Sequence, residues 1–303
     1  MLITTDNFTD LLTPIHRQIF FEEMLSMEKQ YPNVCTADDM RKKEETYGRV
    51  GGLGTWDENT EGNAINEDKF VEGDLATLTA RRFDKGYEIT WEMIEDDLYA
   101  VFSGGMGRGG DAKSLAEGLH QTIEKQIADH YIDGFSDPGY DGVSQFSAVH
   151  PLANVNFTNS NLVTGELTPE NVKEALTTLR DTRAESGLKS RCRGRQLIVG
   201  QNLEWTASEI LSSAKQAGEF SNTANVLPEM EVQVLDYIDD DSTYPNAWFV
   251  RDPKFKNLVQ AWRNKPIYDS YRLQKALNYF FFGAARWDNG FVNYRGVVGS
   301  TGA

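Results

Sequence analysis

The most regular pattern in the chain is a run of apolar residues at helical spacing. One narrow stripe recurs every four residues, at Leu115, Leu119, Ile123, Ile127 and Tyr131. Asp111, ahead of the stripe, is a suitable N-cap, and Gly134, behind it, is a typical stop. A preceding helix begins at Thr90 and pauses at the glycine-rich segment 103–110. The pattern predicts a long spine helix that lies over a sheet.

Helical and strand patterns alternate in residues 166–298. Thr168 caps a helix with Pro169 at its first position. The apolar face of this helix consists of Val172, Ala175, Leu176 and Leu179. Short apolar runs predict strands at 196–199, 232–235 and 247–250, a further helix starts near 203, and 255–298 alternates like β structure. Together with the spine helix, these elements predict an α+β fold that is large enough for two subdomains.

Residues 1–30 are typical of an N-terminal arm followed by an amphipathic stretch. Phe8, Ile19 and Phe20 belong to an apolar stripe at helical spacing, and Pro14 is expected to interrupt it. The pattern leaves open whether this stripe packs in the core or forms a docking surface.

Residues 46–90 predict a long hairpin. Its strands are expected at 46–50 and 76–81, and glycines and asparagines between them favour turns and bends. Seven acidic residues between Asp57 and Asp74 are accompanied by one basic residue, Lys69. The segment has too little apolar content to bury itself, so an ordered hairpin here implies contact with another protein. A flexible solvated loop is the alternative that this composition leaves open.

Charge separates the two halves of the 303-residue chain. Residues 1–150 hold 13 Lys and Arg against 29 Asp and Glu, whereas residues 151–303 hold 17 of each, so the net charge of −16 lies in the first half. A negative surface disfavours readout of DNA or RNA, although such a protein can still enclose nucleic acid. No apolar run is long enough to span a bilayer, no signal-peptide pattern is present, and two cysteines are expected to stay reduced in a cytoplasm.

Few motifs point to catalysis. Gly105, Gly107 and Gly110 have the G-x-G-x-x-G spacing of a dinucleotide site, but a helix rather than a strand precedes them, which favours a simple helix break. The four histidines lack metal-ligand spacing, and the aspartates at 239–241 are typical of a solvated turn. Cys192 lies between two arginines that are able to lower its thiol pKa, but no base accompanies it.

The order of elements resembles that of HK97-fold major capsid proteins, and more narrowly the head subunits of Mu-like tailed phages and prophages. The segments that carry the resemblance are TYG at 46–48, FDKGYEI at 83–89, IEDD at 94–97, YDGVSQF at 140–146, HP at 150–151 and LIV at 197–199. The resemblance covers essentially the whole chain. It implies an N-terminal arm at 1–45, an E-loop hairpin at 46–90, a spine helix and peripheral domain at 91–165, an axial domain at 166–250, and C-terminal strands at 251–303.

The resemblance also implies a function. The chain is expected to be a non-catalytic major capsid protein that self-assembles, as hexamers and pentamers, into the icosahedral shell around phage double-stranded DNA. No cofactor is expected. Portal and a separate scaffold protein are the implied partners, and the implied location is the virion, assembled in the host bacterial cytoplasm. Lys69 is the one lysine in the loop available for a covalent cross-link, and no matched motif supports one. The alternatives are the shell of a cargo-enclosing nanocompartment and a nucleotide-binding α/β enzyme that uses the loop at 105–110.

The charge map then predicts interface residues. The E-loop is expected to lie on a neighbouring subunit through Trp56, Asp57, Glu58, Glu61, Glu67, Asp68, Lys69 and Phe70. The expected basic partners are Lys189, Arg191, Arg193 and Arg195, which share one face if that stretch is extended, and a second patch with Arg251, Lys254 and Arg263. Phe8, Ile19 and Phe20 are the candidates for docking by the N-terminal arm.

Overall fold

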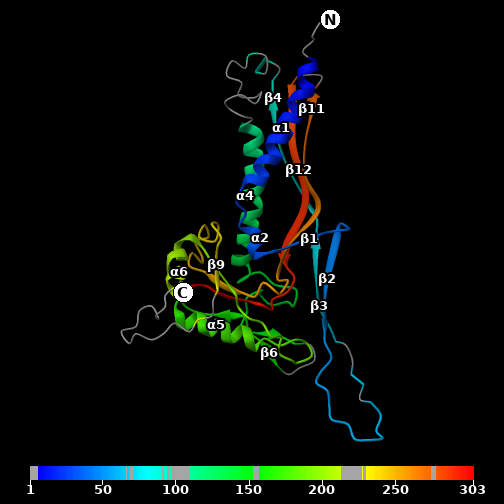
Figure 1. Ribbon diagram of the computed structural model, residues 1–303, viewed down its shortest axis with the longest axis vertical. Helices are drawn as coiled ribbons and strands as arrows, with labels where there is room; N and C mark the ends of the chain where they lie inside the picture. The colour runs from blue at the N-terminus through cyan, green and yellow to red at the C-terminus, as the bar shows by residue number, and fades with distance from the viewer. Residues whose placement is uncertain are drawn as a thin grey trace.

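The computed structural model describes residues 6–65, 67–68, 71–90, 92–93, 96, 110–152, 157–212, 227, 230–273 and 278–303. The molecule is elongated, with a long sheet and two helices at one end, a smaller α/β body beside the C-terminus, and a hairpin that projects past that body (Figure 1). This arrangement agrees with the predicted α+β class.

The long sheet has the strand order β1-β11-β12-β4. Its members are β1 (Thr36–Asp39), β11 (Leu258–Leu273), β12 (Asn278–Phe291) and β4 (Arg81–Ile89). β11 and β12 pair antiparallel over almost their whole length, and β4 pairs antiparallel with β12. Tyr, Phe and Trp recur along β11 and β12, and such residues favour a pleated, half-buried surface.

Helices α1 (Asp6–Ser26), α2 (Tyr31–Val34) and α4 (Gly110–Asp133) accompany this sheet. α4 confirms the predicted helix that ends before Gly134, and its apolar stripe packs into two core clusters. The predicted N-cap is wrong, because α4 already includes Gly110 and Asp111 therefore lies in its first turn. α1 lies alongside α4 and contacts β11 (Figure 1). The expected interruption at Pro14 is wrong, because α1 continues through it. A helix-interior proline costs about 3 kcal/mol, and packing against α4 and β11 offsets that cost.

The α/β body is built on a second sheet with the strand order β7-β13-β10-β8-β9. Its strands are β7 (Leu162–Val163), β13 (Val297–Ser300), β10 (Trp248–Arg251), β8 (Gln196–Val199) and β9 (Glu231–Val234). α5 (Pro169–Asp181), α6 (Glu204–Ser212) and the 3-10 turn η1 (Gln201–Leu203) complete the body, and β5 (His150–Pro151) pairs with β6 (Thr158–Asn159) nearby. The predicted cap of α5 is confirmed, since Asn171 N donates to Thr168 Oγ1, and its four predicted apolar residues are buried.

β2 (Glu44–Gly51) and β3 (Val71–Thr79) form the projecting hairpin, with Thr46 opposite Thr77. The predicted pairing of 46–50 with the strand near 76 is therefore confirmed. The hairpin ends at Thr79, because the next residues form β4 of the long sheet rather than a continuation of the hairpin. No helix in the described part of the chain combines the length and apolarity needed to cross a membrane.

Candidate assembly surfaces

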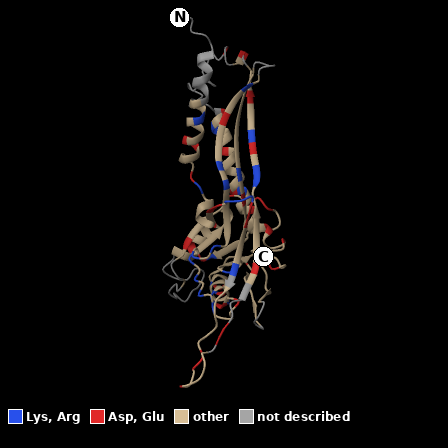
Figure 2. Cartoon of the chain, turned by 90° about the vertical axis from the view of Figure 1, so that its right-hand side faces the viewer, with Lys and Arg blue, Asp and Glu red and all other residues tan. Residues whose placement is uncertain are grey.

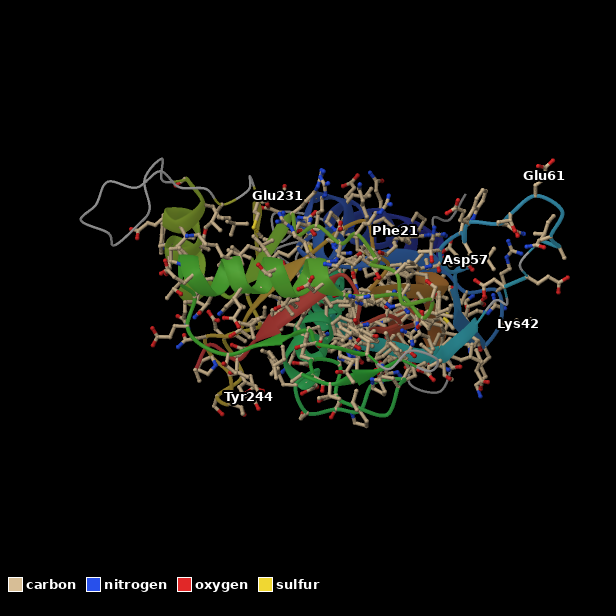
Figure 3. All side chains as sticks on the ribbon, turned by 90° about the horizontal axis from the view of Figure 1, so that it is seen from below. Phe21, Lys42, Asp57, Glu61, Glu231 and Tyr244 are labelled. Atoms are coloured by element: carbon tan, nitrogen blue, oxygen red, sulfur yellow. The ribbon has the colours of Figure 1, made fainter. Side chains whose placement is uncertain are left out.

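The tip of the hairpin, between Gly51 and Val71, carries exposed apolar and acidic side chains together. Trp56 is 97% exposed and Ile65 is 88% exposed. The exposed acids of the tip are Asp57, Glu58, Glu61, Glu67 and Asp68. Figure 2 shows acidic residues recurring along the projecting hairpin, and Figure 3 shows Glu61 at the outer end of the loop, pointing away from the body. Lys69 and Phe70, which were also predicted here, lie outside the described residues.

Local hydrogen bonds shape the described part of this tip, where Leu53, Trp56 and Ile65 are exposed. Gly54 N donates to Asp68 Oδ2 at 2.6 Å, and Asn59 Nδ2 donates to Ala64 O at 2.6 Å. A nearly fully exposed indole beside an exposed isoleucine is typical of a surface that another protein covers. The exposure of these side chains fits the interface predicted for the tip, which stays a prediction.

The basic residues at 189–195 come together on one surface. Lys189, Arg191, Arg193 and Arg195 are exposed, whereas Cys192 and Gly194, which alternate with the arginines, are buried. Together with Arg180 they line a hollow of about 930 Å³, which we call the basic hollow. Residues 190–195 belong to no strand, and Arg191 has a positive φ of 56°, so this stretch is not the extended strand on which the prediction depended. Lys189 already forms an ion pair within its own chain, because its Nζ lies 2.7 Å from Asp181 Oδ1.

The second predicted basic patch is only partly present. Arg251 is 3% exposed, and its Nη1 donates to Asn33 O and to Gln196 Oε1, so its prediction as an interface residue is wrong. It is a β10 residue whose side chain lies beneath the surface, where internal oxygens take its hydrogen bonds. Lys254 and Arg263 are exposed, as an interface role requires.

The described residues of the N-terminal stripe, Ile19 and Phe20, contact other parts of their own subunit. Phe20 is 1% exposed, its ring lies 5.2 Å from that of Tyr268, and Ile19 packs against the same cluster. The prediction that Phe20 docks on another subunit is therefore wrong, because α4 and the long sheet of the same chain already cover it. Ile19 is half-buried, and its role in docking stays a prediction. The side chain of Phe8 lies outside the described part of the chain.

Comparison with known proteins decides the family. The profile of the family described as "Phage capsid protein" matches residues 75–299. The chain belongs to this family of phage capsid proteins. A comparison with curated protein sequences found no match.

Solved phage particles share the fold of this capsid protein, which is of the HK97 type. The procapsid of bacteriophage JBD30 is 14% identical, with a TM-score of 0.52 over 98% of this chain and 76% of that chain. The capsid of the native GTA particle is 10% identical, with a TM-score of 0.55 over 89% of each chain. The mature capsid of bacteriophage PhiM1 is 10% identical, with a TM-score of 0.54 over 88% of this chain and 83% of that chain.

Cys192 and the glycine-rich loop were the sites considered for catalysis. Burial raises the pKa of Cys192 to about 12, with a further contribution from Asp252, so the flanking arginines do not activate this thiol. Both arginines point to the surface, whereas the thiol is buried. Residues 101–109 of the glycine-rich loop lie outside the described residues, and Gly110 is the first residue of α4. No group of histidine, cysteine or carboxylate side chains in the described residues is arranged to hold a metal ion.

A buried charged cluster at the middle of the hairpin was not predicted from the sequence. Arg49 of β2 lies near Glu185, which in turn pairs with Arg295, and we call these three residues the Arg49 cluster. Glu185 is 4% exposed and Arg295 is 8% exposed. The three residues come from distant segments with no shared local pattern, so only the folded chain reveals the cluster.

Proposed function

We propose that this capsid protein is the major head subunit, which self-assembles through hexamers and pentamers into the icosahedral shell around phage double-stranded DNA. It acts by packing against copies of itself and needs no catalysis. Portal and a separate scaffold protein are its proposed partners, and assembly takes place in the host bacterial cytoplasm before the subunit becomes part of the virion. The narrower likeness to Mu-like phages stays a prediction.

The observation that carries the proposal is the projecting hairpin with its exposed tip. Trp56 has almost no cover in its own chain, yet the tip has ordered hydrogen bonds. Burying an aromatic side chain of this size removes roughly 150–250 Å² of surface from water, which favours association. Together with the family match, this supports a subunit whose hairpin is completed by a neighbour.

Charge supports the same interface. The acids of the tip complement the positive charge of the basic hollow. Among the described contacts, one ion pair, Lys189 with Asp181, involves a basic side chain of the hollow. The basic residues that line it are Arg180, Lys189, Arg191, Arg193 and Arg195. Exposed ion pairs contribute roughly 0–1 kcal/mol each, so they set register and steer encounter, while Trp56 contributes more to affinity. The acidic surface elsewhere fits a wall that does not adsorb the packaged DNA.

Size-exclusion chromatography with light scattering on the full chain, followed by negative-stain imaging of the heaviest fraction, tests the function. Capsomers or closed shells support it. A compact monomer that persists at high concentration and with a crowding agent contradicts it. Shells that enclose a protein cargo instead of DNA would favour the nanocompartment alternative.

Charge reversal tests the interface itself. Glu58, Glu61 and Glu67 are changed together to lysine, while Asp68 is kept because it accepts the hydrogen bond from Gly54 N. We expect this variant to stay folded and to lose normal assembly. Reversal of Lys189, Arg191, Arg193 and Arg195 to glutamate in the same chain should restore it. Normal shells from the first variant, or no restoration by the second set, would exclude this pairing of surfaces.

A further inference from the structure

The hairpin touches the body of the molecule again at its middle, after it has left the long sheet. At its base, Ala76 and Leu78 pack in a core cluster with Met40, Val259 and Ala261. Between Gly48 and Val50 the pairing of β2 with β3 shifts register, so the ladder is irregular at Arg49. A bulge of this kind bends and twists a two-stranded ribbon, and thereby changes the direction in which it continues.

Arg49 reaches from this irregular point into the body. Its side chain is 11% exposed, and its Nη1 lies 3.6 Å from Glu185 Oε1. The guanidinium carbon lies 4.0 Å from the centre of the Tyr140 ring and 5.5 Å from that of Tyr294. Nε and Nη1 of Arg49 have no hydrogen-bond partner among the described residues. The contact therefore depends on charge and on stacking over the rings. An ammonium also carries the charge, but only the planar guanidinium can stack.

Glu185 is held in place for this contact. Both of its carboxylate oxygens accept hydrogen bonds from Nη2 of Arg295. Gly73 of β3 makes the approach possible, because a Cβ at this position would lie 2.9 Å from Glu185 Oε1 and 3.3 Å from the Cβ of Arg49. Any larger residue at 73 would push the carboxylate away from the hairpin.

The rings under Arg49 are themselves fixed to the core. Tyr294 N donates to Tyr140 Oη at 2.9 Å, and the Tyr294 ring stacks on His150 with a centroid distance of 3.9 Å. His150 is fully buried, with Nδ1 2.6 Å from Asp141 Oδ2 and Nε2 2.9 Å from Asn161 Oδ1. Arg49 therefore rests on a rigid stack that begins deep in the molecule.

A buried ion cluster of this kind contributes little to stability, because desolvation of the charges opposes their attraction, but it can select one arrangement of the chain. We propose that the Arg49 cluster is a clamp that sets the direction of the hairpin, and so positions its tip for the neighbouring subunit. The inference rests on the proposed function and adds a positioning role for three residues far from the tip. If the direction of the hairpin is not fixed, only a fraction of the subunits has the hairpin in the orientation that binds. The apparent affinity between subunits is then reduced by that fraction.

Arg49→Met removes the charge and keeps an apolar side chain that packs on the two tyrosines, while Glu185 remains paired with Arg295. The readout is the distance between spin labels at Thr60→Cys in the tip and Glu174→Cys on α5, measured on labelled full-length chain diluted with unlabelled chain. We expect the narrow distance distribution of the parent to broaden, with the melting temperature unchanged or raised. Arg82→Met, the same change on β4 at an exposed arginine paired with Asp84, should keep the narrow distribution.

Assembly is then compared among the same variants. Arg49→Met and Gly73→Ala should both lower the rate and yield of closed shells, and Arg49→Lys should resemble Arg49→Met because it keeps the charge without the stacking. A narrow distribution in Arg49→Met, or broadening without any loss of assembly, would overturn the clamp. If the parent does not assemble at all, the proposed function fails, and the distance measurement still decides whether Arg49 sets the direction of the hairpin.

Discussion

Asp288 should hold the corner where the hairpin joins the long sheet, and its replacement by alanine should destabilise the folded subunit. Asp288 Oδ2 accepts a hydrogen bond from Thr79 N at 2.8 Å. Its Oδ1 accepts from Arg81 Nε at 3.1 Å and Nη2 at 2.9 Å. Thr79 is the last residue of β3 and Arg81 is the first of β4, so one carboxylate on β12 spans the turn between them.

The two contacts differ in expected magnitude. A hydrogen bond from a backbone N–H to a charged acceptor contributes about 1.5–3 kcal/mol, and loss of the acceptor leaves a half-buried donor unpaired. The side chain of Arg81 is 57% exposed, so water screens its pair with Asp288, which is expected to contribute about 0–1 kcal/mol. Asp288→Ala should therefore lower the free energy of unfolding by about 2–3 kcal/mol, and Arg81→Ala should lower it by less than about 1 kcal/mol.

Urea unfolding of the unassembled subunit, followed by tryptophan fluorescence, measures both changes. The double variant completes the cycle, and its coupling energy isolates the Arg81 pair from the Thr79 hydrogen bond. Asp288→Asn serves as the isosteric control and should fall between the parent and the alanine variant. If Arg81→Ala costs as much as Asp288→Ala, the exposed ion pair dominates and this reasoning is refuted.

Three further predictions concern single sites. Thr168→Ala removes the N-cap of α5 and should lower the free energy of unfolding by about 1 kcal/mol, measured by urea denaturation. Burial raises the pKa of Glu124, so its ionisation opposes folding at neutral pH and this penalty fades as the pH falls through the raised value. Glu124→Gln should therefore melt above the parent at pH 7, with a difference that shrinks toward pH 5. Burial raises the pKa of Cys35 and Cys192 to about 12, so neither thiol should react with a disulfide reagent at pH 8 until urea unfolds the chain.

The controls for these sites follow from their contacts. Thr168→Ser keeps the capping oxygen and should match the parent, and equal losses for serine and alanine would contradict a capping role. Glu124 Oε1 accepts from the backbone N–H groups of Gln30 and Tyr31, which the amide oxygen of glutamine can also do. A difference in melting temperature that does not change with pH would contradict the ionisation argument. Rapid modification of either thiol in the folded chain would contradict its burial.

Local patterns in the sequence were sufficient for most regular elements. The stripe ending at Tyr131 predicted α4, and Thr168 with Pro169 predicted the start of α5, because helical periodicity and capping act over a few neighbouring residues. The pairing of the hairpin near Thr46 was also predictable from alternation and turn residues. These signals lie within one element and need no knowledge of its surroundings.

Burial and electrostatics were decided by the tertiary structure. Arg251 was expected at the surface and is buried, because its oxygen partners come from Asn33 and Gln196. The two arginines beside Cys192 are able to lower its pKa, but burial raises it instead. Pro14 was expected to interrupt the N-terminal helix. Instead α1 continues through it and packs against α4.

By itself, the sequence determined which segments are helices and strands and that the first half carries the negative charge. It also carried the order of elements that the phage capsid family shares. Only the tertiary structure decided which cations remain exposed in the basic hollow, which aromatic side chain has no cover, and how Arg49 fixes the direction of the hairpin. The physical reason is range: periodicity and capping act between neighbours in the chain, whereas desolvation, ion pairing and stacking depend on groups that folding brings together from distant positions.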